Sequence, residues 1–372
     1  MNDGTGLTRR DFVAGGAAAM AWTRIGPSAF GGTDGDPRLA EAKRWFKAAQ
    51  YGMMVHWGLY SLLAGEYRGK RMDSRYIGEW IQQYYRIPNA EYARLAKAFN
   101  PLYFDADEWV GLARDAGMKY LVFTAKHHDG FAMYRSRVSK YNVVDATPFG
   151  RDVVGELAEA CRRHGLKLGL YYSQELDWNE PDGGGDALGK TWSGGAAYWT
   201  NNWDFPDASK KVFSRCYERK IRPQVEEILT QYGDLCLVWF DIGLHMPKAL
   251  CRDLYDLVRS RQPACLINSR LGCGICDYTS AGDNEIPDDD KSGMLFETPA
   301  TLNDTWGYKA HDQNWKSAAE VRRIRDHLKA RGANYLLNVG PDHLGRIPAP
   351  SADILRAAKR NIDEPVFAKL KG

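Results

Sequence analysis

The chain has 372 residues, enough for one large α/β barrel or for two modest domains. Lys and Arg number 50 and Asp and Glu 47, and the resulting net charge of +3 excludes both the basic excess of a nucleic-acid-binding protein and a disordered acidic tail. The seven Cys residues are too few for a disulfide scaffold. With 12 Trp and 20 Tyr, the chain is rich in aromatic rings, which suit either a sugar-binding cleft or a large core.

The first 35 residues have the pattern of an export leader. Residues 8–13 read TRRDFV and precede a short apolar run at 13–22 and the small residues PSA at 27–29. This order predicts a twin-arginine signal and linker over 1–35, with a periplasmic or extracellular location; a chance arginine pair is the alternative. No other stretch has 18 consecutive apolar residues, so we expect no membrane span after the leader is removed.

From residue 36 onward, short apolar runs alternate with amphipathic helical patterns. In chain order the patterns predict a helix at 40–49, a strand at 51–56, a helix at 106–116, a strand at 120–125, a helix at 152–164, a strand at 167–172, a helix at 210–232, a strand at 235–241, a helix at 248–261, a strand at 264–268, a helix at 318–330, a strand at 335–339 and a helix at 351–361.

The strand runs LVFTA, LCLVWF and YLLNV are apolar on both faces, which is typical of parallel strands covered by helices. Six β-α units, with further strands near 293–297 and elsewhere, predict an α/β fold, a (β/α)8 TIM-like barrel forming one domain over 36–372. A doubly wound sheet is the alternative. It is disfavoured because the first strand ends in VHWG (55–58), without a glycine-rich phosphate loop.

Polar side chains collect at the carboxyl ends of the predicted strands, where barrel enzymes carry their catalytic groups. His56, the pair His127 and His128, Asp241 and Arg270 each follow a different strand. One histidine at a strand end is usually structural, whereas several at successive strand ends favour a functional site.

The spacing of these residues limits the chemistry. Neighbouring residues of a strand point to opposite faces, so we expect His127 and His128 to share no metal ion, and we expect no metal or cofactor. No GxSxG nucleophile elbow occurs. What remains is Asp241, with further carboxylates in the loop 272–291. Paired carboxyl groups beside aromatic and histidine side chains are the equipment of glycoside hydrolysis, although a helix N-cap explains Asp241 equally well.

Seven motifs follow one another along most of the chain: WFKAAQYGMMVHWG (45–58), FNPLYFDADEWVGLARDAGMKYLVFTAKHHDGFAMYRS (99–136), GLYYS (169–173) with DW (177–178), LVWFDIG (237–243), INSRLG (267–272), TLNDTWGY (301–308) and GANYLLNVGPDHLGRIP (332–348). Their order and spacing resemble the α-L-fucosidases of glycoside hydrolase family 29. The resemblance implies a (β/α)8-like catalytic domain and a retaining exo-glycosidase that removes terminal α-L-fucose through a covalent fucosyl-enzyme intermediate.

The resemblance also implies roles for the matching residues. Asp241 corresponds to the nucleophile, and His56, His127 and His128 correspond to residues that hydrogen-bond the fucose hydroxyls. The other substrate contacts assigned in this way are Trp57, Glu79, Tyr172, Trp239, Arg270, Glu297 and Trp306. Because fucose lacks a hydroxyl at C6, its pocket needs an apolar wall for the methyl group and polar groups for O2, O3 and O4.

The acid/base residue is the least defined. Many relatives place it as Glu in a Thr-Pro-Glu-like motif before Ile-Pro, whereas residues 277–290 read DYTSAGDNEIPDDD here. Alignment on Ile-Pro puts Asp283 at that place and Glu285 two residues later, and we rank the two level. Glu297 is a third candidate, ranked below both.

Several expectations stay open at this stage. The chain after residue 348 is too short for the β-sandwich that often follows this family's barrel, and oligomerisation could replace it. Cys273 and Cys276 form either a loop disulfide or two free thiols. We expect a fucosylated oligosaccharide or glycoconjugate as substrate. The alternatives are a non-catalytic fucose-binding barrel and a same-fold glycosidase for a related sugar such as an α-L-galactoside.

Overall fold

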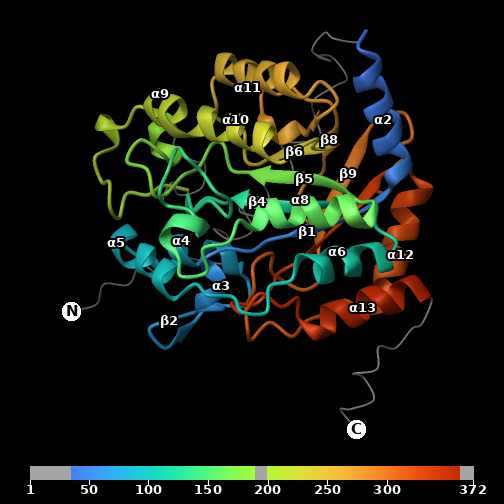
Figure 1. The fold of residues 1–372 in the computed structure, drawn as a ribbon, viewed down its shortest axis with the longest axis horizontal. Helices are drawn as coiled ribbons and strands as arrows, with labels where there is room; N and C mark the ends of the chain where they lie inside the picture. The colour runs from blue at the N-terminus through green and yellow to red at the C-terminus, as the bar shows by residue number, and fades with distance from the viewer. Residues whose placement is uncertain (1–34, 189–198, 361–372) are drawn as a thin grey trace.

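A computed structural model describes residues 35–188 and 199–360, so the predicted leader lies outside the described residues (Figure 1). Eight parallel strands lie side by side in chain order, with bounds β1 (Tyr51–Val55), β4 (Tyr120–Lys126), β5 (Lys167–Tyr172), β6 (Leu237–Phe240), β7 (Leu266–Ile267), β8 (Thr279–Ser280), β9 (Phe296–Thr301) and β10 (Asn334–Val339). The last strand, β10, pairs with β1, and a bridge between Asn268 and Tyr278 joins β7 to β8. The predicted (β/α)8 barrel is confirmed.

Helices surround the strands (Figure 1). The longer helices are α2 (Pro37–Ala49), α6 (Ala106–Asp115), α8 (Val153–His164), α10 (Arg222–Gln231), α11 (Lys248–Arg261), α12 (Ala318–Ala330) and α13 (Ala349–Arg360). The short elements are α3 (Tyr60–Leu63), α4 (Ile81–Tyr85), α5 (Asn89–Tyr92), α7 (Val143–Ala146), α9 (Phe213–Cys216) and the antiparallel pair β2 (Glu66–Tyr67) and β3 (Lys70–Arg71). Between β7 and β9, where every residue is described, no α-helix occurs.

Local sequence signals set the ends of these helices. Asp105, Asp152 and Ser317 cap α6, α8 and α12 by accepting hydrogen bonds from backbone N–H groups of the first turn. Gly165 ends α8 in the left-handed conformation that glycine adopts without steric cost. Helix α2 lies across the N-terminal end of the barrel, where the ring of Phe46 lies 4.5 Å from that of Tyr278.

The helix predicted over 210–232 is not a single regular helix. It begins as α9, continues as a π-helical turn (Tyr217–Ile221) and ends as α10. Pro223, in the first turn of α10, has no N–H for the i to i−4 ladder, and a π-turn accommodates such an interruption. The two-residue strand β8 was missed, because it is short and lies in a polar stretch that we interpreted as loop.

Alternation along the strands divides the core into two layers. Inward-facing side chains of β1, β4, β5 and β6, among them Met54, Tyr120, Tyr171 and Trp239, form the barrel interior with α2. The residues between them pack outward against the helices. This alternation decides which strand residues reach the site.

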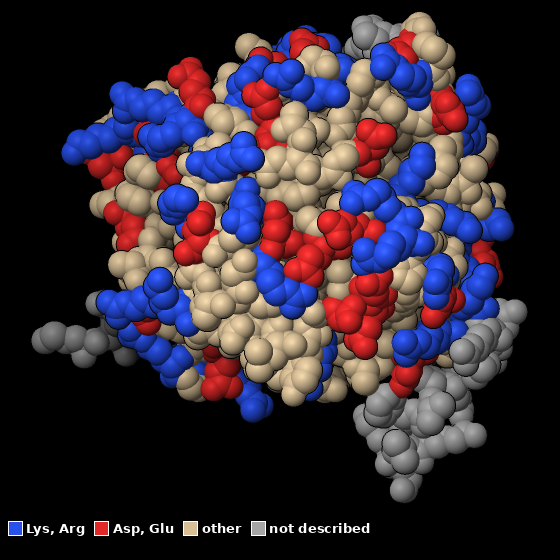
Figure 2. All heavy atoms as spheres, viewed as in Figure 1, with Lys and Arg blue, Asp and Glu red and all other residues tan. Residues whose placement is uncertain are grey.

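The surface offers no single dominant charge on the face that Figure 2 shows, where basic and acidic side chains are interspersed. Within the described residues, no helix combines the length and apolarity needed to cross a bilayer. Cys273 and Cys276 are both free thiols, so the structure does not have the loop disulfide that was one of the two alternatives.

Candidate active site

Asp241 lies just after β6 at the carboxyl end of the barrel, with only 8% of its surface exposed. One carboxylate oxygen, Oδ2, accepts a 2.8 Å hydrogen bond from the Tyr171 hydroxyl. The other, Oδ1, accepts from Nη1 of Arg270 at 3.0 Å and from the backbone N–H of Ile242 at 2.9 Å. One donor to Oδ2 and two donors to Oδ1 therefore orient the carboxylate.

The charge state of Asp241 follows from opposing effects. Burial raises the pKa of this carboxyl, but the Arg270 charge, His128 and the Tyr171 hydroxyl together hold the pKa below its ordinary value. Nε2 of His128 lies 3.6 Å from Oδ2. Asp241 is thus ionised at neutral pH and available as a nucleophile.

A buried glutamine fixes the backbone around Asp241. The side-chain amide of Gln174 accepts a hydrogen bond from the Asp241 N–H and donates one to the Arg270 carbonyl, both at 2.9 Å. The next residue, Ile242, has a φ of 70°, which is rare for a β-branched side chain. Gln174 therefore ties the loop after β6 to the loop after β7 beside a strained turn.

Arg270 joins Asp241 to a second carboxylate. Its Nη2 donates to Oδ1 of Asp283 at 2.6 Å and to the Ala281 carbonyl at 2.9 Å, and its guanidinium lies over the Trp239 ring at 4.6 Å. The Arg270 guanidinium therefore lies between the carboxylates of Asp241 and Asp283. Burial lowers the pKa of Arg270, but the two carboxylates outweigh this effect and raise it, so the bridging group stays charged.

Three histidines form a neutral cluster beside Asp241. The ring centroids of His127 and His128 are 4.1 Å apart, and those of His56 and His127 are 5.5 Å apart. Burial lowers the pKa of His56 to about 4, that of His128 to about 3 and that of His127 well below its ordinary value.

A neutral imidazole has one donor and one acceptor nitrogen, a combination that matches sugar hydroxyls. Two ring nitrogens are oriented by the protein, since Nδ1 of His56 is 2.8 Å from Oδ1 of Asn338 and Nδ1 of His128 is 2.6 Å from the Ser173 hydroxyl. Nδ1 of His127 is buried without a hydrogen-bond partner in the described part of the chain.

Trp306 borders the cluster, and Glu79, in the 3-10 turn Gly78–Trp80, holds the residue after Trp306. The Trp306 ring lies 5.2 Å from that of His56, and Oε2 of Glu79 accepts a 2.7 Å hydrogen bond from the N–H of Gly307. Burial raises the pKa of Glu79 to about 8. No group of three or more His, Cys, Asp or Glu side chains that could hold a metal ion occurs within 35–188 and 199–360.

Comparison with known proteins assigns this constellation to a family. The family profile described as alpha-L-fucosidase matches residues 30–360. The chain belongs to the alpha-L-fucosidase family. Human tissue alpha-L-fucosidase is 38% identical over 325 residues, which cover 82% of this chain and 64% of that protein. This chain spans between 63% and 69% of the length of the curated relatives that it matches.

Solved members of the alpha-L-fucosidase family share the fold at high identity. Unliganded alpha-L-fucosidase AlfC from Lactobacillus casei is 55% identical, with a TM-score of 0.81 over 86% of this chain and 98% of that one. A mutant of that enzyme was solved in complex with Fucα(1,6)GlcNAc, at 54% identity and a TM-score of 0.79, with the same coverage of both chains.

Among the residues assigned by resemblance, His56, His127, His128, Trp239, Asp241, Arg270 and Trp306 come together at one end of the barrel. Our expectation that His127 and His128 point to opposite faces was wrong. The pairing of β4 with β5 shifts register between Thr124 and Lys126, and β4 ends at Lys126, so strand alternation no longer applies to the two histidines.

Three of the residues assigned by resemblance, Trp57, Tyr172 and Glu297, lie away from this group, each in a packed part of the core. Trp57 packs outside the barrel against Phe99 and Trp109, with ring centroids 5.2 and 5.1 Å away. Tyr172 points to the helix side of β5, where its hydroxyl donates to Gln224.

Glu297 is fully buried in the barrel interior, where its two carboxylate oxygens accept hydrogen bonds from Tyr120 and Trp239. Both oxygens are occupied in this way, which fits a structural role and not contact with substrate.

Tyr171 and Gln174 were missed by sequence reasoning. Tyr171 pairs with Trp239 across β5 and β6, and paired residues of parallel strands share a face, so the strand register that the structure supplies turns Tyr171 inward. No sequence signal distinguishes Gln174, whose partners are backbone atoms 67 and 96 residues away.

Proposed function

We propose that this chain is a retaining exo-α-L-fucosidase, with Asp241 as nucleophile and Asp283 as acid/base. The observation that carries the proposal is the Arg270 guanidinium, which bonds both carboxylates at the carboxyl end of the barrel. The carboxylate of Glu285 turns back to accept the N–H of Gly282 at 3.1 Å. Asp283 is therefore the better placed of the two acid candidates.

In the first step a carboxylate oxygen of Asp241 attacks the anomeric carbon. Asp283, which must carry a proton and leave its ion pair with Arg270 for this step, transfers that proton to the glycosidic oxygen. The C1–O bond breaks, the leaving group departs as an alcohol, and an ester joins Asp241 to fucose. Asp283 then accepts a proton from water, which attacks C1 and releases L-fucose with retained configuration. About 47% of the Asp283 side chain is exposed, which gives it room to turn from Arg270 to the leaving oxygen.

The side chains around Asp241 suit a neutral 6-deoxy sugar. Neutral His56, His127 and His128 offer donors and acceptors to hydroxyls, and the ring of Trp306 supplies apolar surface. Because the relative AlfC was solved with Fucα(1,6)GlcNAc, we include this disaccharide among the proposed substrates.

The test is release of L-fucose from fucosylated oligosaccharides and an aryl fucoside, with the anomeric form of the first product read by NMR. Asp241→Asn should lower kcat by at least about 10³-fold on every substrate. Asp283→Asn should lower kcat by about 10²–10⁴-fold on the disaccharide, and by less on the aryl fucoside, whose leaving group needs less protonation. Glu285→Gln, the matched change in the same loop, should retain activity.

Three results would contradict this assignment. An inverted first product would exclude the double-displacement mechanism. Loss of activity in Glu285→Gln, with activity retained in Asp283→Asn, would exchange the roles of the two residues. L-Fucose binding without release of fucose from any substrate would instead support the non-catalytic alternative.

We also propose that the chain is exported by the twin-arginine route to the periplasm or beyond. The support is the TRRDFV sequence at 8–13 and the apolar run that follows it. Replacing Arg9 and Arg10 by Lys should retain the protein in the cytoplasm, as read by cell fractionation with a cytoplasmic marker. Unchanged export of the double variant would refute the proposal.

A further inference from the structure

An exposed thiol and a buried thiol lie together beside the segment that carries Arg270. The exposed one belongs to Cys273, which follows Arg270 by three residues in the loop after β7. The buried one belongs to Cys251, in the first turn of α11, the helix that precedes β7 in the chain. Neither sulfur has a role in the reaction proposed above, so the pair is free for a different chemistry.

The two thiols meet at one backbone carbonyl. The Cys273 thiol donates to the Met246 carbonyl at 3.4 Å, and Sγ of Cys251 lies 3.9 Å from the same oxygen and 3.4 Å from the Leu271 carbonyl. The two thiols also contact each other through a hydrogen bond. From this contact, turns about the side-chain bonds bring the sulfur atoms to the ~2 Å separation of a disulfide.

Cys276, the other cysteine of this loop, lies on its opposite side. Burial raises the pKa of the Cys276 thiol to about 11, and the charges that act on this thiol belong to Asp277 and to Lys43 of α2. Helix α2 crosses the N-terminal end of the barrel, whereas Met246 follows β6 at the carboxyl end. Cys251 is therefore the partner in place for Cys273.

Access to reagents also singles out Cys273. Of the seven cysteines, all of which lie within the described residues, only Cys273 is exposed. Burial raises the pKa of Cys251, so this thiol is protected from direct attack by a dissolved reagent. An oxidising reagent therefore reacts at Cys273 first, and Cys251 is next to it to complete the bond.

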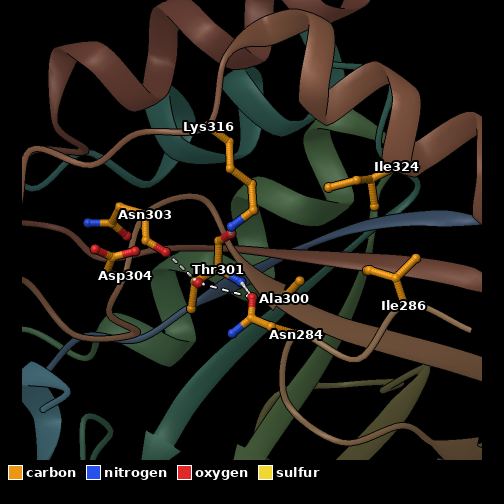
Figure 3. A pocket seen from close by; sticks show the side chains of 8 residues that line it. All are labelled: Asn284, Ile286, Ala300, Thr301, Asn303, Asp304, Lys316 and Ile324. Carbon is orange, nitrogen blue, oxygen red and sulfur yellow. Dashed lines mark hydrogen bonds between the residues drawn. The ribbon is translucent and has the colours of Figure 1, made fainter. Parts of the chain in front are cut away.

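A covalent link at this place would act on the active site through Arg270. On the side of the proposed acid, the Asn284 side-chain oxygen accepts hydrogen bonds from the N–H and the hydroxyl of Thr301 at 2.9 and 3.1 Å, which fastens that segment to β9 (Figure 3). On the other side, the contact of Cys273 with its neighbours consists of thiol hydrogen bonds, which are weak. A disulfide would fasten this side to α11.

We propose that Cys251 and Cys273 form a disulfide by exchange with an oxidised dithiol compound or protein, and that this bond fastens the Arg270 loop to α11. The Cys273 thiolate attacks one sulfur of the oxidant's disulfide, and the other sulfur leaves and takes up the proton that Cys273 released. Cys251 then attacks Sγ of Cys273 in the mixed disulfide, and its proton passes to the departing thiolate. The protein loses two hydrogen atoms, and the oxidant is reduced to two thiols.

The test treats the folded full chain with oxidised glutathione, alkylates the remaining thiols and maps the peptides by mass spectrometry with fragmentation. We expect a peptide pair joined through Cys251 and Cys273, which disappears after treatment with dithiothreitol. The Tm of the oxidised protein should exceed that of the reduced protein by about 5 °C, because a cross-link that closes a loop of about 20 residues restricts the unfolded chain.

Two serine variants complete the test. Cys273→Ser, at an exposed position, should lose both the cross-link and the rise in Tm, whereas the matched change Cys276→Ser in the same loop should retain both. A Cys273–Cys276 bond, a dimer joined through Cys273 of two chains, or alkylation of both Cys251 and Cys273 after oxidation would each overturn the proposal. A Cys251–Cys273 cross-link with an unchanged Tm would refute the fastening of the loop.

Discussion

Gln174 offers a sharp test of how the site is positioned, because its amide bonds two backbone groups and contacts no substrate-facing atom. In Gln174→Met the side chain keeps its length but leaves the Asp241 N–H and the Arg270 carbonyl without partners. Each unpaired buried group costs about 1–3 kcal/mol, so the free energy of unfolding should fall by about 2–6 kcal/mol.

The same change should lower kcat. Without Gln174 the strained turn at Ile242 can relax and move the Asp241 carboxylate, and a misplacement of about 1 Å costs about 10²-fold in rate. KM should change less than kcat, because the histidines that we propose as the ligands of the fucose hydroxyls are left in place.

Gln224 is the matched control on the other side of β5. It is equally buried and also makes two side-chain hydrogen bonds, accepting from the Tyr172 hydroxyl at 2.9 Å and donating to the Ser136 hydroxyl at 3.1 Å. Urea unfolding should show comparable destabilisation of Gln174→Met and Gln224→Met. Assays on an aryl fucoside, at a temperature where both are folded, should show the loss of kcat only in Gln174→Met. Equal kcat values in the two variants would refute the positioning role.

Two further predictions concern ionisation. Tyr171→Phe removes a hydrogen-bond donor to ionised Asp241, so the pKa of Asp241 should rise. The acidic limb of the pH profile of kcat/KM should then move to higher pH. The control, Tyr172→Phe, should leave this limb in place. An unmoved limb in Tyr171→Phe would contradict the hydrogen bond as a cause. Burial raises the pKa of Glu297 from 4.5 to about 7, so the folded protein keeps a proton that the unfolded chain releases, and stability is lost as pH rises through this range. Relative to Glu297→Gln, the wild type should lose about 3 kcal/mol of unfolding free energy between pH 4.5 and 7. Urea unfolding of both proteins across this pH range measures the loss. If the difference in unfolding free energy between the two proteins stays constant with pH, the prediction is wrong.

The errors in the sequence-based site share one origin. Tyr172 and Trp57 were assigned as substrate contacts because they lie in matching motifs, but membership of a motif does not state which face of the sheet a residue occupies. The inward face of the barrel is set by pairing with neighbouring strands, as for Tyr171 and Trp239. Glu297, assigned by resemblance as a substrate contact, lies within the interior layer.

The choice between Asp283 and Glu285 shows what depends on loop conformation. Both carboxylates lie in the loop between β8 and β9, two residues apart, and the sequence ranks them level. The backbone at Asn284, with φ of 59°, directs Asp283 to Arg270 while Glu285 returns to the N–H of Gly282. This difference arises from bonds to β9 and to Arg270, which lie outside the loop.

The sequence by itself determined the barrel, the strand ends that carry the histidines and Asp241, and membership of the family, because apolar runs and local motifs are properties of contiguous residues. Only the tertiary structure decided which tyrosine bonds Asp241, which carboxylate shares Arg270 with it, and that Gln174 holds both backbones. Each of these depends on contacts between residues far apart in the chain, and a side chain's partners across such distances are set by strand register, loop conformation and packing together.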